Sequence, residues 1–485
     1  MSRIPGLKTR RNAELGLLAF AMALVAAFGA TVEANKYDQL QPNFWVPAAL
    51  LSILFLGLHI VVRYVAPYAD PVLLPTVALI NGIGVAFLRR IDIANAINDK
   101  KGPPGIFSGI GGRQLAWTLI ALILAAALLL LIRDHRNVSK YAYTLGLTGI
   151  VLMMIPAVLP GSISEVNGAK LWIKLGAFSI QPGEFAKLML VTFFAYYLVR
   201  KREVLSLASK RFLGIDFPRG RDLGPVVTVW LFSLLVLVFE KDLGTALLYF
   251  GLFVVTLYVA TERSSWLIIG LLLFFGGVYL AYLLGASVGG PFANFYDRAE
   301  IWLNPFSQAN YERASGNSYQ LVQGLLGLGT GGLFGTGPGA GSPLSVPEVQ
   351  NDFIFAGLGE EIGLFGLSAL LVCYVLIAMR GLRAAIGVRD SFGKLVAGGL
   401  SFTLGLQVFV ILGGITGLIP LTGQTTPFLS SGGSSLMANW LLIAMLLRIS
   451  NASRGPAVGG GGPERPGPKK APTQLHGAMT EVIKP

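Results

Sequence analysis

The stretch LAWTLIALILAAALLLLI, residues 115–132, runs for eighteen residues without a single charge. A run of this length spans the hydrocarbon core of a bilayer when it folds as a helix. A second uncharged run, WLIIGLLLFFGGVYLAYLLGAS at 266–287, repeats the pattern far along the chain. Of all 485 residues, 53% are hydrophobic and only 13% are charged, about half the charge of a typical soluble protein. These features predict a polytopic membrane protein.

Twelve apolar runs are separated by polar connections. They fall at about 15–32, 44–62, 71–88, 115–132, 141–159, 183–199, 223–239, 243–260, 266–287, 353–379, 395–415 and 434–448. The first run is expected to be retained, because no clear small-residue cleavage site precedes Glu33. With the N-terminus in the cytoplasm, 26 of the 38 Lys and Arg residues lie on the cytoplasmic side, as the positive-inside rule requires. We therefore expect an all-α polytopic fold with about twelve transmembrane spans and both termini cytoplasmic.

Charge and cysteine content exclude several classes of function. The net charge is +13, but basic loops in a membrane protein fix orientation and contact anionic lipids. No nucleic acid partner is therefore expected. Cys373 is the single cysteine, so no disulfide framework exists. The three histidines, His59, His135 and His476, are too far apart in sequence for metal-ligand spacing.

Two segments lie outside the apolar runs. Residues 451–485 include GGGGPERPGPKKAP and are expected to form a disordered cytoplasmic tail. The longest connection, about 288–352, is expected to be extracytoplasmic and holds ten glycines between Gly316 and Gly341. Glycines at this density let backbone N–H groups approach an anion. The alternative, which the sequence alone favours, is a flexible loop.

The segment NGAKLWIKLGAFSIQPGEFAKL, residues 167–188, carries aromatic and charged side chains at the predicted outer surface. Pro182 is expected to open a helix that places Glu184 and Lys187 on one face. These two residues either form an ion pair with Lys187 reaching outward, or line a polar cavity that binds substrate. Trp172 suits a membrane interface, and a stack on a sugar ring is the alternative.

Four further acids stand at or near predicted helix starts. Asp242 lies in a tight outside turn between two apolar runs and is expected to cap the next helix, which does not exclude a polar role at the same place. Asp352 ends the long outside connection, either as a helix cap or as an acid that faces an outside cleft. Glu360 and Glu361 follow two turns deeper in the next run, so they require internal partners or protonation.

Together with TGLIPLTGQTTPFLSSGGSSL at 416–436, these segments resemble the SEDS family of cell-shape, division and sporulation proteins, which includes RodA, FtsW and SpoVE. The resemblance covers about residues 70–450. It implies a ten-helix core at 70–450, preceded at 1–69 by a cytoplasmic segment and two added transmembrane helices. Such additions resemble those of actinobacterial members. The motif at 416–436 is more similar to the elongation type of the family than to the division type.

The resemblance implies a peptidoglycan glycosyltransferase that polymerises lipid II for cell-wall elongation and cell shape. In the family, the acid of the pattern H-T-D-F-I-F is essential, and it falls on Asp352, here as the general base. Family motif positions expected to bind substrate fall on Trp172, Glu184, Lys187, Asp242, Arg298, Tyr319 and Gln320. The chain departs from the pattern in reading Gln-Asn-Asp at 350–352, and in Leu171, where Arg is common.

The implied reaction joins an α-linked donor through a β-1,4 bond, so a single inverting displacement needs no covalent glycosyl-enzyme. Arg298 and Lys187 would offset charge on the departing lipid diphosphate. A divalent cation, Mg²⁺ or Mn²⁺, is a candidate cofactor, with Asp242 as a candidate ligand.

The resemblance also implies a location and a partner. The protein is expected in the cell membrane with its active face outside, beside a class B penicillin-binding protein that acts as transpeptidase. Three alternatives remain at this point: a flippase for lipid II, a division-type polymerase, and a scaffold without catalytic activity. Polymer formation from lipid II in detergent, where no second leaflet exists, separates a polymerase from a flippase.

Overall fold

The structure is a computed structural model that describes residues 9–166, 169–176, 178–205, 208–212, 215–218, 224–239, 242–313 and 317–456. Within these residues, each of the twelve predicted apolar runs corresponds to one helical element, and the element at 354–387 is kinked at Gly363, whose φ of +65° and ψ of −174° are not helical. The helices are α1 (Arg11–Tyr37), α2 (Val46–Val65), α3 (Leu73–Asn98), α4 (Gly109–Leu131), α5 (Ala142–Val158), α7 (Pro182–Leu205), α8 (Gly224–Phe239), α9 (Leu243–Thr261), α10 (Ser265–Ser287), α14 (Ile354–Gly387), α15 (Ser391–Ile415) and α16 (Gly433–Arg454).

Nine helical segments in the described part of the chain are long and apolar enough to cross a membrane. The predicted class, an all-α polytopic membrane protein, is therefore confirmed. The number of twelve crossings and the cytoplasmic side of the termini stay predictions.

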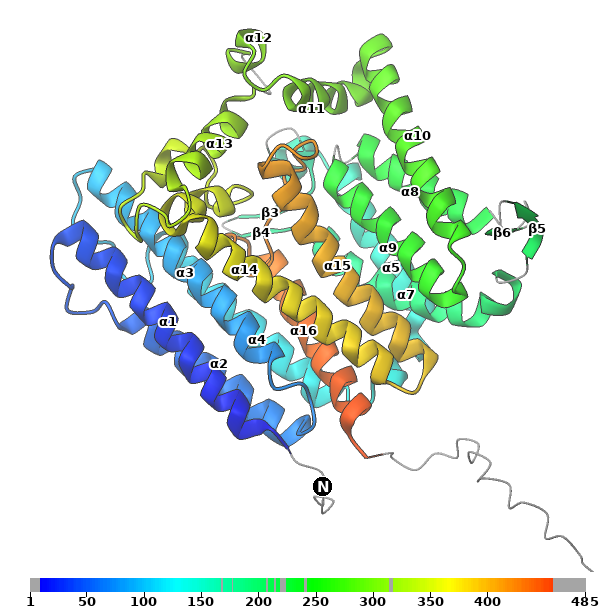
Figure 1. The fold of residues 1–485 in the computed structure, drawn as a ribbon, viewed down its shortest axis with the longest axis horizontal. Helices are drawn as coiled ribbons and strands as arrows, with labels where there is room; N and C mark the ends of the chain where they lie inside the picture. Colours follow the sequence, from blue (N-terminus) through cyan, green and yellow to red (C-terminus); the bar gives the residue numbers. More distant parts are fainter. Residues whose placement is uncertain are drawn as a thin grey trace, which may run out of the picture.

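The long helices form one slanted bundle (Figure 1). Helices α1 and α2 lie at one edge and pack on α3 and α4, whereas α10 lies at the opposite side. Helix α16 lies at the centre, where it packs on α4, α14 and α7. Its apolar window is 83% buried, against 17% for α10. Helix α16, the last in the described part of the chain, is therefore the core of the bundle.

Helix α3 runs ten residues beyond the predicted apolar run, which ended at residue 88. The added turns contain three charged residues that the hydropathy pattern excludes from a membrane helix. Each of them has a partner: Arg89 pairs with Glu33 at 3.2 Å, Arg90 pairs with Glu361 at 2.9 Å, and Asp92 accepts backbone N–H groups at the start of α4. The helix continues because its charges are satisfied by other segments.

The long connection at 288–352 contains much regular structure. It includes α11 (Ala293–Leu303), α12 (Gln308–Tyr311), α13 (Tyr319–Gly331) and the 3₁₀ turns η3 (Gly290–Phe292) and η4 (Pro343–Ser345). These helices lie at one end of the bundle, above α14 and α15 in Figure 1. An earlier 3₁₀ turn, η1 (His135–Tyr141), leads into α5.

The glycine-rich part of this connection is bonded to α14. The N–H of Gly339 donates to Glu361 Oε2 at 2.9 Å, and the N–H of Ser342 donates to Glu360 Oε1 at 3.0 Å. Arg90 also donates to the carbonyls of Gly339 and Gly341. The favoured expectation of a flexible loop is therefore wrong for this stretch. Its N–H groups do bind anions, but these anions are the carboxylates of Glu360 and Glu361 in the same protein. Glu361 thus has the internal partner that its position in the helix required.

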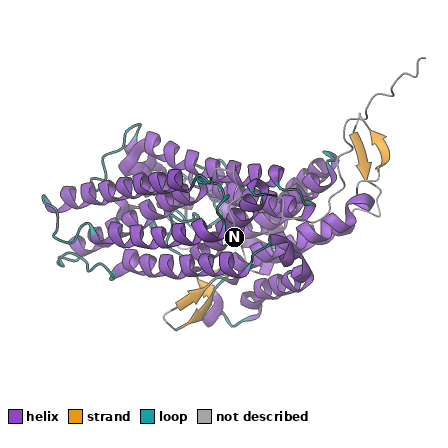
Figure 2. Ribbon diagram, turned by 90° about the horizontal axis from the view of Figure 1, so that it is seen from below, coloured by secondary structure: helices purple, strands orange, loops and turns teal. Residues whose placement is uncertain are grey.

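In the described part of the chain, three short antiparallel hairpins accompany the helices. Hairpin β1 (Glu165–Val166) with β2 (Ala169–Lys170) and hairpin β3 (Ile173–Leu175) with β4 (Phe178–Ile180) follow the short α6 (Gly161–Ser164). Hairpin β5 (Ala208–Phe212) with β6 (Ile215–Pro218) lies between α7 and α8. The hairpins project from the helical body in Figure 2. The sequence analysis did not predict these strands, because each is only two to five residues long.

The start of α1 and the end of α16 meet at one end of the bundle. Arg11 donates to the Ala69 carbonyl and Arg454 pairs with Asp70, so both are fixed to the turn before α3. Helix α16 ends at Arg454, a few residues into the stretch in which a tail was expected from Asn451. The rest of that tail, residues 457–485, lies outside the described residues.

The buried pair Arg90–Glu361 gives a stability prediction. We expect Arg90→Met to cost about 3–5 kcal/mol, because it leaves Glu361 buried without its cation. The double variant Arg90→Met/Glu361→Leu should recover part of the loss, since it removes both charges. Thermal unfolding midpoints in detergent measure the effect. Strictly additive losses in the double variant would contradict the pairing.

Candidate functional site

The candidate site is organised by residues 416–432, called here the connecting loop, which join α15 to α16. Arg298 on α11 donates to the Leu421 carbonyl at 3.0 Å, and Trp302 donates to the Gly417 carbonyl at 2.7 Å. On the other side, the N–H of Ser431 donates to the Gln350 carbonyl at 2.8 Å. The loop therefore contacts both ends of the long connection, including the residues just before Asp352.

Asp352 lies at this junction with its carboxyl group turned toward α13. Gln320 Nε2 is 3.4 Å from Asp352 Oδ1 and donates to the Pro347 carbonyl at 3.1 Å. Helix α14 begins after Phe353 without a side-chain cap. The alternative role for Asp352, capping that helix, is therefore not realised. Its carboxyl group instead accepts from the Gln320 side chain and from the Asp352 backbone N–H.

Arg298 is the cation of the site. Its guanidinium interacts electrostatically with both Asp242 and Asp352. Burial raises the pKa of Asp352 to about 6, and the Arg298 charge opposes that rise. Burial also lowers the pKa of Arg298 and raises that of Asp242, since each charged form loses water. Two acids and one arginine, distant in sequence, thus share one electrostatic environment.

Asp242 caps α9 as predicted, accepting from the Thr245 N–H at 3.1 Å and from the Thr245 hydroxyl. The same hydroxyl accepts from Gln424 Nε2 of the connecting loop at 2.9 Å. Gly244 is required here, because a Cβ atom at this residue would lie 2.5 Å from the Gln424 side chain. The cap therefore also fixes the connecting loop.

Glu184 and Lys187 form the predicted ion pair on α7 at 2.7 Å, and Pro182 opens that helix. The prediction that Lys187 reaches outward is wrong, because its side chain is only 5% exposed. Lys187 also donates to Gln407 Oε1 on α15 at 2.9 Å, and Gln407 donates to the Thr425 carbonyl at 3.1 Å. This pair is thereby joined to the connecting loop.

The centre of the connecting loop is held in a strained conformation. Phe428 has φ +66°, a value that bulky side chains rarely adopt. Its ring is buried and packs edge-on against Trp440 of α16, with 5.7 Å between centroids. Tyr374 donates to the Pro427 carbonyl, and the backbone at 428–429 lies directly against Gly84 of α3. Packing from three helices maintains the strain.

Two of the predicted binding residues lie less directly in this arrangement. Tyr319 precedes Gln320 on α13, and its ring packs edge-on against Tyr311 at 5.4 Å. Trp172 is half-buried next to β3, and its backbone N–H donates to the Ser164 carbonyl at 3.3 Å.

Several residues of the site escaped the sequence analysis. Gln407 and Gln424 connect the acids to the connecting loop, and Gln114 of α4 donates to the Ser430 carbonyl at 3.0 Å. For Gln114 and Gln407, an amide in an otherwise apolar helix was the available signal, since such a group requires a partner inside the membrane. The sequence does not reveal which partner each amide has.

The donors at Asp242 do not form a cation site. Both carboxylate oxygens bond to Thr245, and no three His, Cys, Asp or Glu side chains gather in the described part of the chain. The candidate Mg²⁺ or Mn²⁺ therefore has no fitting ligand set among these residues.

The fold is that of a polytopic helical membrane protein, and its two acids and one arginine lie together at one end of the bundle. A family model described as "Cell cycle protein", for FtsW, RodA and SpoVE, matches residues 71–455. The chain belongs to the SEDS family.

Individual relatives narrow the comparison. The peptidoglycan glycosyltransferases RodA of Mycobacterium tuberculosis and Mycobacterium leprae are each 46% identical to the chain, over 93% of both sequences. The alignments with these two enzymes are 453 and 456 residues long, which is more than residues 71–485 contain. They therefore extend into α1 and α2, which precede the region that the family model matches. Stage V sporulation protein E of Bacillus subtilis is 35% identical over 66% of this chain and 80% of its own length.

A solved structure has the same fold. It is described as the structural coordination of polymerization and crosslinking by a peptidoglycan synthase complex. The match has a TM-score of 0.57 at 25% identity and covers 79% of this chain and 98% of that one.

The close contact at Gly84 predicts sensitivity of the connecting loop to a single methyl group. A Cβ atom at Gly84 would lie 2.7 Å from the Leu429 carbonyl oxygen, and backbone cannot rotate away. Gly84→Ala should therefore cost about 1–3 kcal/mol. The matched control is Gly398→Ala on α15, whose Cβ meets nothing within 4 Å and which should change stability by about 1 kcal/mol or less. Equal unfolding midpoints for the two variants would refute the contact.

Proposed function

We propose that this chain is a peptidoglycan glycosyltransferase that polymerises lipid II on the outer face of the cell membrane, with Asp352 as general base. The identity of 46% with mycobacterial RodA enzymes over 93% of the chain supports the enzyme class and the elongation type. The observation that carries the role of Asp352 is its position: a carboxyl group uncommitted to capping, between Gln320 and Arg298, with its pKa raised by burial to about 6.

The proposed reaction uses Asp352 to remove the proton from the 4-hydroxyl of the acceptor sugar. The acceptor oxygen attacks the anomeric carbon of the donor as the bond to the lipid diphosphate breaks. The diphosphate leaves with the bonding electron pair, and the proton passes to Asp352. A carboxyl group with a pKa near 6 is ionised at neutral pH and still basic enough to assist, an effect of about 10²–10⁴-fold in rate.

The departing diphosphate requires positive charge. Arg298 interacts electrostatically with Asp352 and donates to the Leu421 carbonyl, so we assign it the first contact with the diphosphate. Lys187 donates to Glu184 and Gln407, which leaves one of its three ammonium donors for substrate. Its charge is balanced by Glu184, so its contribution is expected to be smaller than that of Arg298.

Twelve crossings with both termini in the cytoplasm are part of the proposal. The start of α1 and the end of α16 meet at Ala69 and Asp70, which supports an even number of crossings. The excess of Lys and Arg on that side supports its cytoplasmic assignment. A class B penicillin-binding protein is the proposed partner, supported by the fold likeness to the peptidoglycan synthase complex.

The first test replaces the base. Asp352→Asn should fold and insert normally yet produce no glycan chains from lipid II in detergent, because the amide cannot accept the proton. The matched control is Glu312→Gln, an exposed acid in the same connection, which should polymerise at the wild-type rate. Polymer from Asp352→Asn at the wild-type rate would remove this residue from the mechanism. A wild-type protein that moves lipid II across vesicles but makes no polymer would instead indicate a flippase.

The second test is the pH dependence. Because the pKa of Asp352 is raised to about 6, the base is protonated below that pH and ionised above it. The rate of polymerisation at lipid II concentrations well below saturation, which follows kcat/KM and so reports the free protein, should therefore rise with pH and reach half its plateau near pH 6. Initial rates between pH 5 and 8 measure the profile, and Glu312→Gln should share its midpoint. A rate that is constant from pH 5 to 7 would contradict the assignment.

A further inference from the structure

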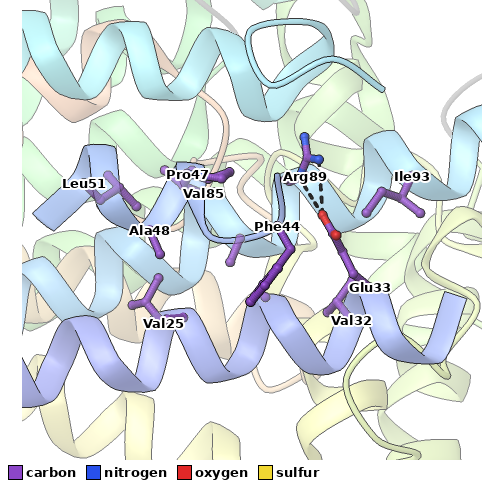
Figure 3. Close-up of a pocket in the computed structure, with 13 residues that line it drawn as sticks. Val25, Val32, Glu33, Phe44, Pro47, Ala48, Leu51, Val85, Arg89 and Ile93 are labelled. Atoms are coloured by element: carbon purple, nitrogen blue, oxygen red, sulfur yellow. Dashed lines mark hydrogen bonds and ion pairs between the residues drawn. The ribbon is translucent and has the colours of Figure 1, made fainter. Parts of the chain in front are cut away.

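A half-open pocket lies between α1, the start of α2 and α3, at some remove from the candidate site (Figure 3). Its lining is mostly apolar and includes Val25, Val32, Phe44, Leu51 and Ile93. In Figure 3 the ring of Phe44 lies beside the cleft between the two N-terminal helices and α3. The pocket is built largely by the segment that precedes the family core, so the added helices create a feature that the core alone does not have.

One charged pair interrupts this apolar lining. Both Nε and Nη2 of Arg89 donate to the same oxygen of Glu33, Oε1, at 3.4 and 3.2 Å. The other oxygen, Oε2, is buried and has no hydrogen-bond partner among the described residues. One turn further along α1, the buried hydroxyl of Tyr37 also lacks a partner in that part of the chain. A carboxylate that is 3% exposed with an unused oxygen requires a donor from elsewhere.

The pocket lies next to the long connection. Asn35 donates to the Pro338 carbonyl at 2.7 Å, and Val32 lies against Gly339. The connection 288–352 also carries Arg298 and Gln320, so the pocket and the candidate site belong to the same end of the bundle. Under the proposed orientation, the pocket opens at the depth of the outer leaflet, where lipid chains and their polar heads are present.

We propose that this pocket, with a volume of about 30 Å³, receives the donor group of a membrane amphiphile, an N–H or O–H of its polar head that is directed to Glu33 Oε2. The chain of the amphiphile lies along the apolar rim of the pocket, and Glu33 selects the head. Two kinds of lipid supply this chemistry: a phospholipid with a primary ammonium head, such as phosphatidylethanolamine, and a glycolipid with sugar hydroxyls. Phosphatidylcholine has the same chains but no donor in its head, so it serves as the matched control ligand.

The glycines of α1 provide a selective way to block the pocket. Gly29 lines it, and a Cβ atom at Gly29 meets nothing within 4 Å. Gly29→Leu should therefore fill the space without displacing the helices. Gly16 lies on the same helix, outside the pocket, and its Cβ also meets nothing within 4 Å. Gly16→Leu is thus the matched control for the change in residue.

The experiment is native mass spectrometry of the full chain in detergent, titrated separately with phosphatidylethanolamine, a monoglucosyl diacylglycerol and phosphatidylcholine of identical acyl chains. We expect one molecule of a donor-bearing lipid to bind roughly tenfold or more tightly than phosphatidylcholine. Gly29→Leu should lose that binding and Gly16→Leu should retain it. Glu33→Gln should reduce the preference for donor-bearing heads. Whichever of the two donor-bearing lipids binds more tightly identifies the source.

Equal binding of all three lipids, or binding by Gly29→Leu equal to that of wild type, would overturn the proposal. A water molecule as the only additional hydrogen-bond partner of Glu33 would also overturn the proposal, because the protein would then show no preference among the three lipids. Photolabelling of the wild-type protein tests the same site without any substitution that could unfold it. A diazirine placed on the acyl chain of phosphatidylethanolamine should label residues 25–51 and 85–93, and labelling spread evenly over all outer helices would contradict the site.

Discussion

The arrangement of the candidate site depends on one segment, the connecting loop at 416–432, which Arg298 contacts directly and which Asp242 and Lys187 each reach through one side chain. Arg298 bonds to its Leu421 carbonyl, Thr245 bonds to its Gln424, and Gln407 bonds to its Thr425 carbonyl. The loop is in turn fixed by Phe428, whose unfavourable backbone conformation is maintained by buried packing. A rigid, strained segment can hold charged groups from distant helices at constant distances.

The other end of the same region is organised by buried acids. Glu360 and Glu361 accept backbone N–H groups of the glycine-rich segment, and Arg90 neutralises Glu361. Asp352 lies at the start of the same helix, so this network also positions the proposed base. Arg89, the neighbour of Arg90 on α3, pairs with Glu33 of the N-terminal helix α1. Two adjacent arginines of α3 therefore make the two connections. Arg89 joins α3 to the added helix α1, and Arg90 joins α3 to α14 of the polymerase core.

The long apolar helices could be predicted from sequence because their hydropathy contrasts with that of the connections. Their ends could not, because residues such as Arg90 extend a helix only when a distant acid accepts them. The acids at Asp242 and Asp352 were identified by position and by family resemblance. Their common environment was not, since it arises from Gln424 and Arg298, which come from segments far apart in the chain. Short hairpins such as β3–β4 have too few residues for a periodic signal.

The central claim is that Asp352 and Arg298 act on the same bound substrate. The most direct measurement is an electron cryomicroscopy structure of the wild-type protein with a non-hydrolysable lipid II analogue and an acceptor sugar. The account predicts the acceptor 4-hydroxyl within hydrogen-bonding distance of the Asp352 carboxylate and the diphosphate against Arg298. Density for the diphosphate on another face of the bundle, with Asp352 bonded only to protein groups, would contradict it.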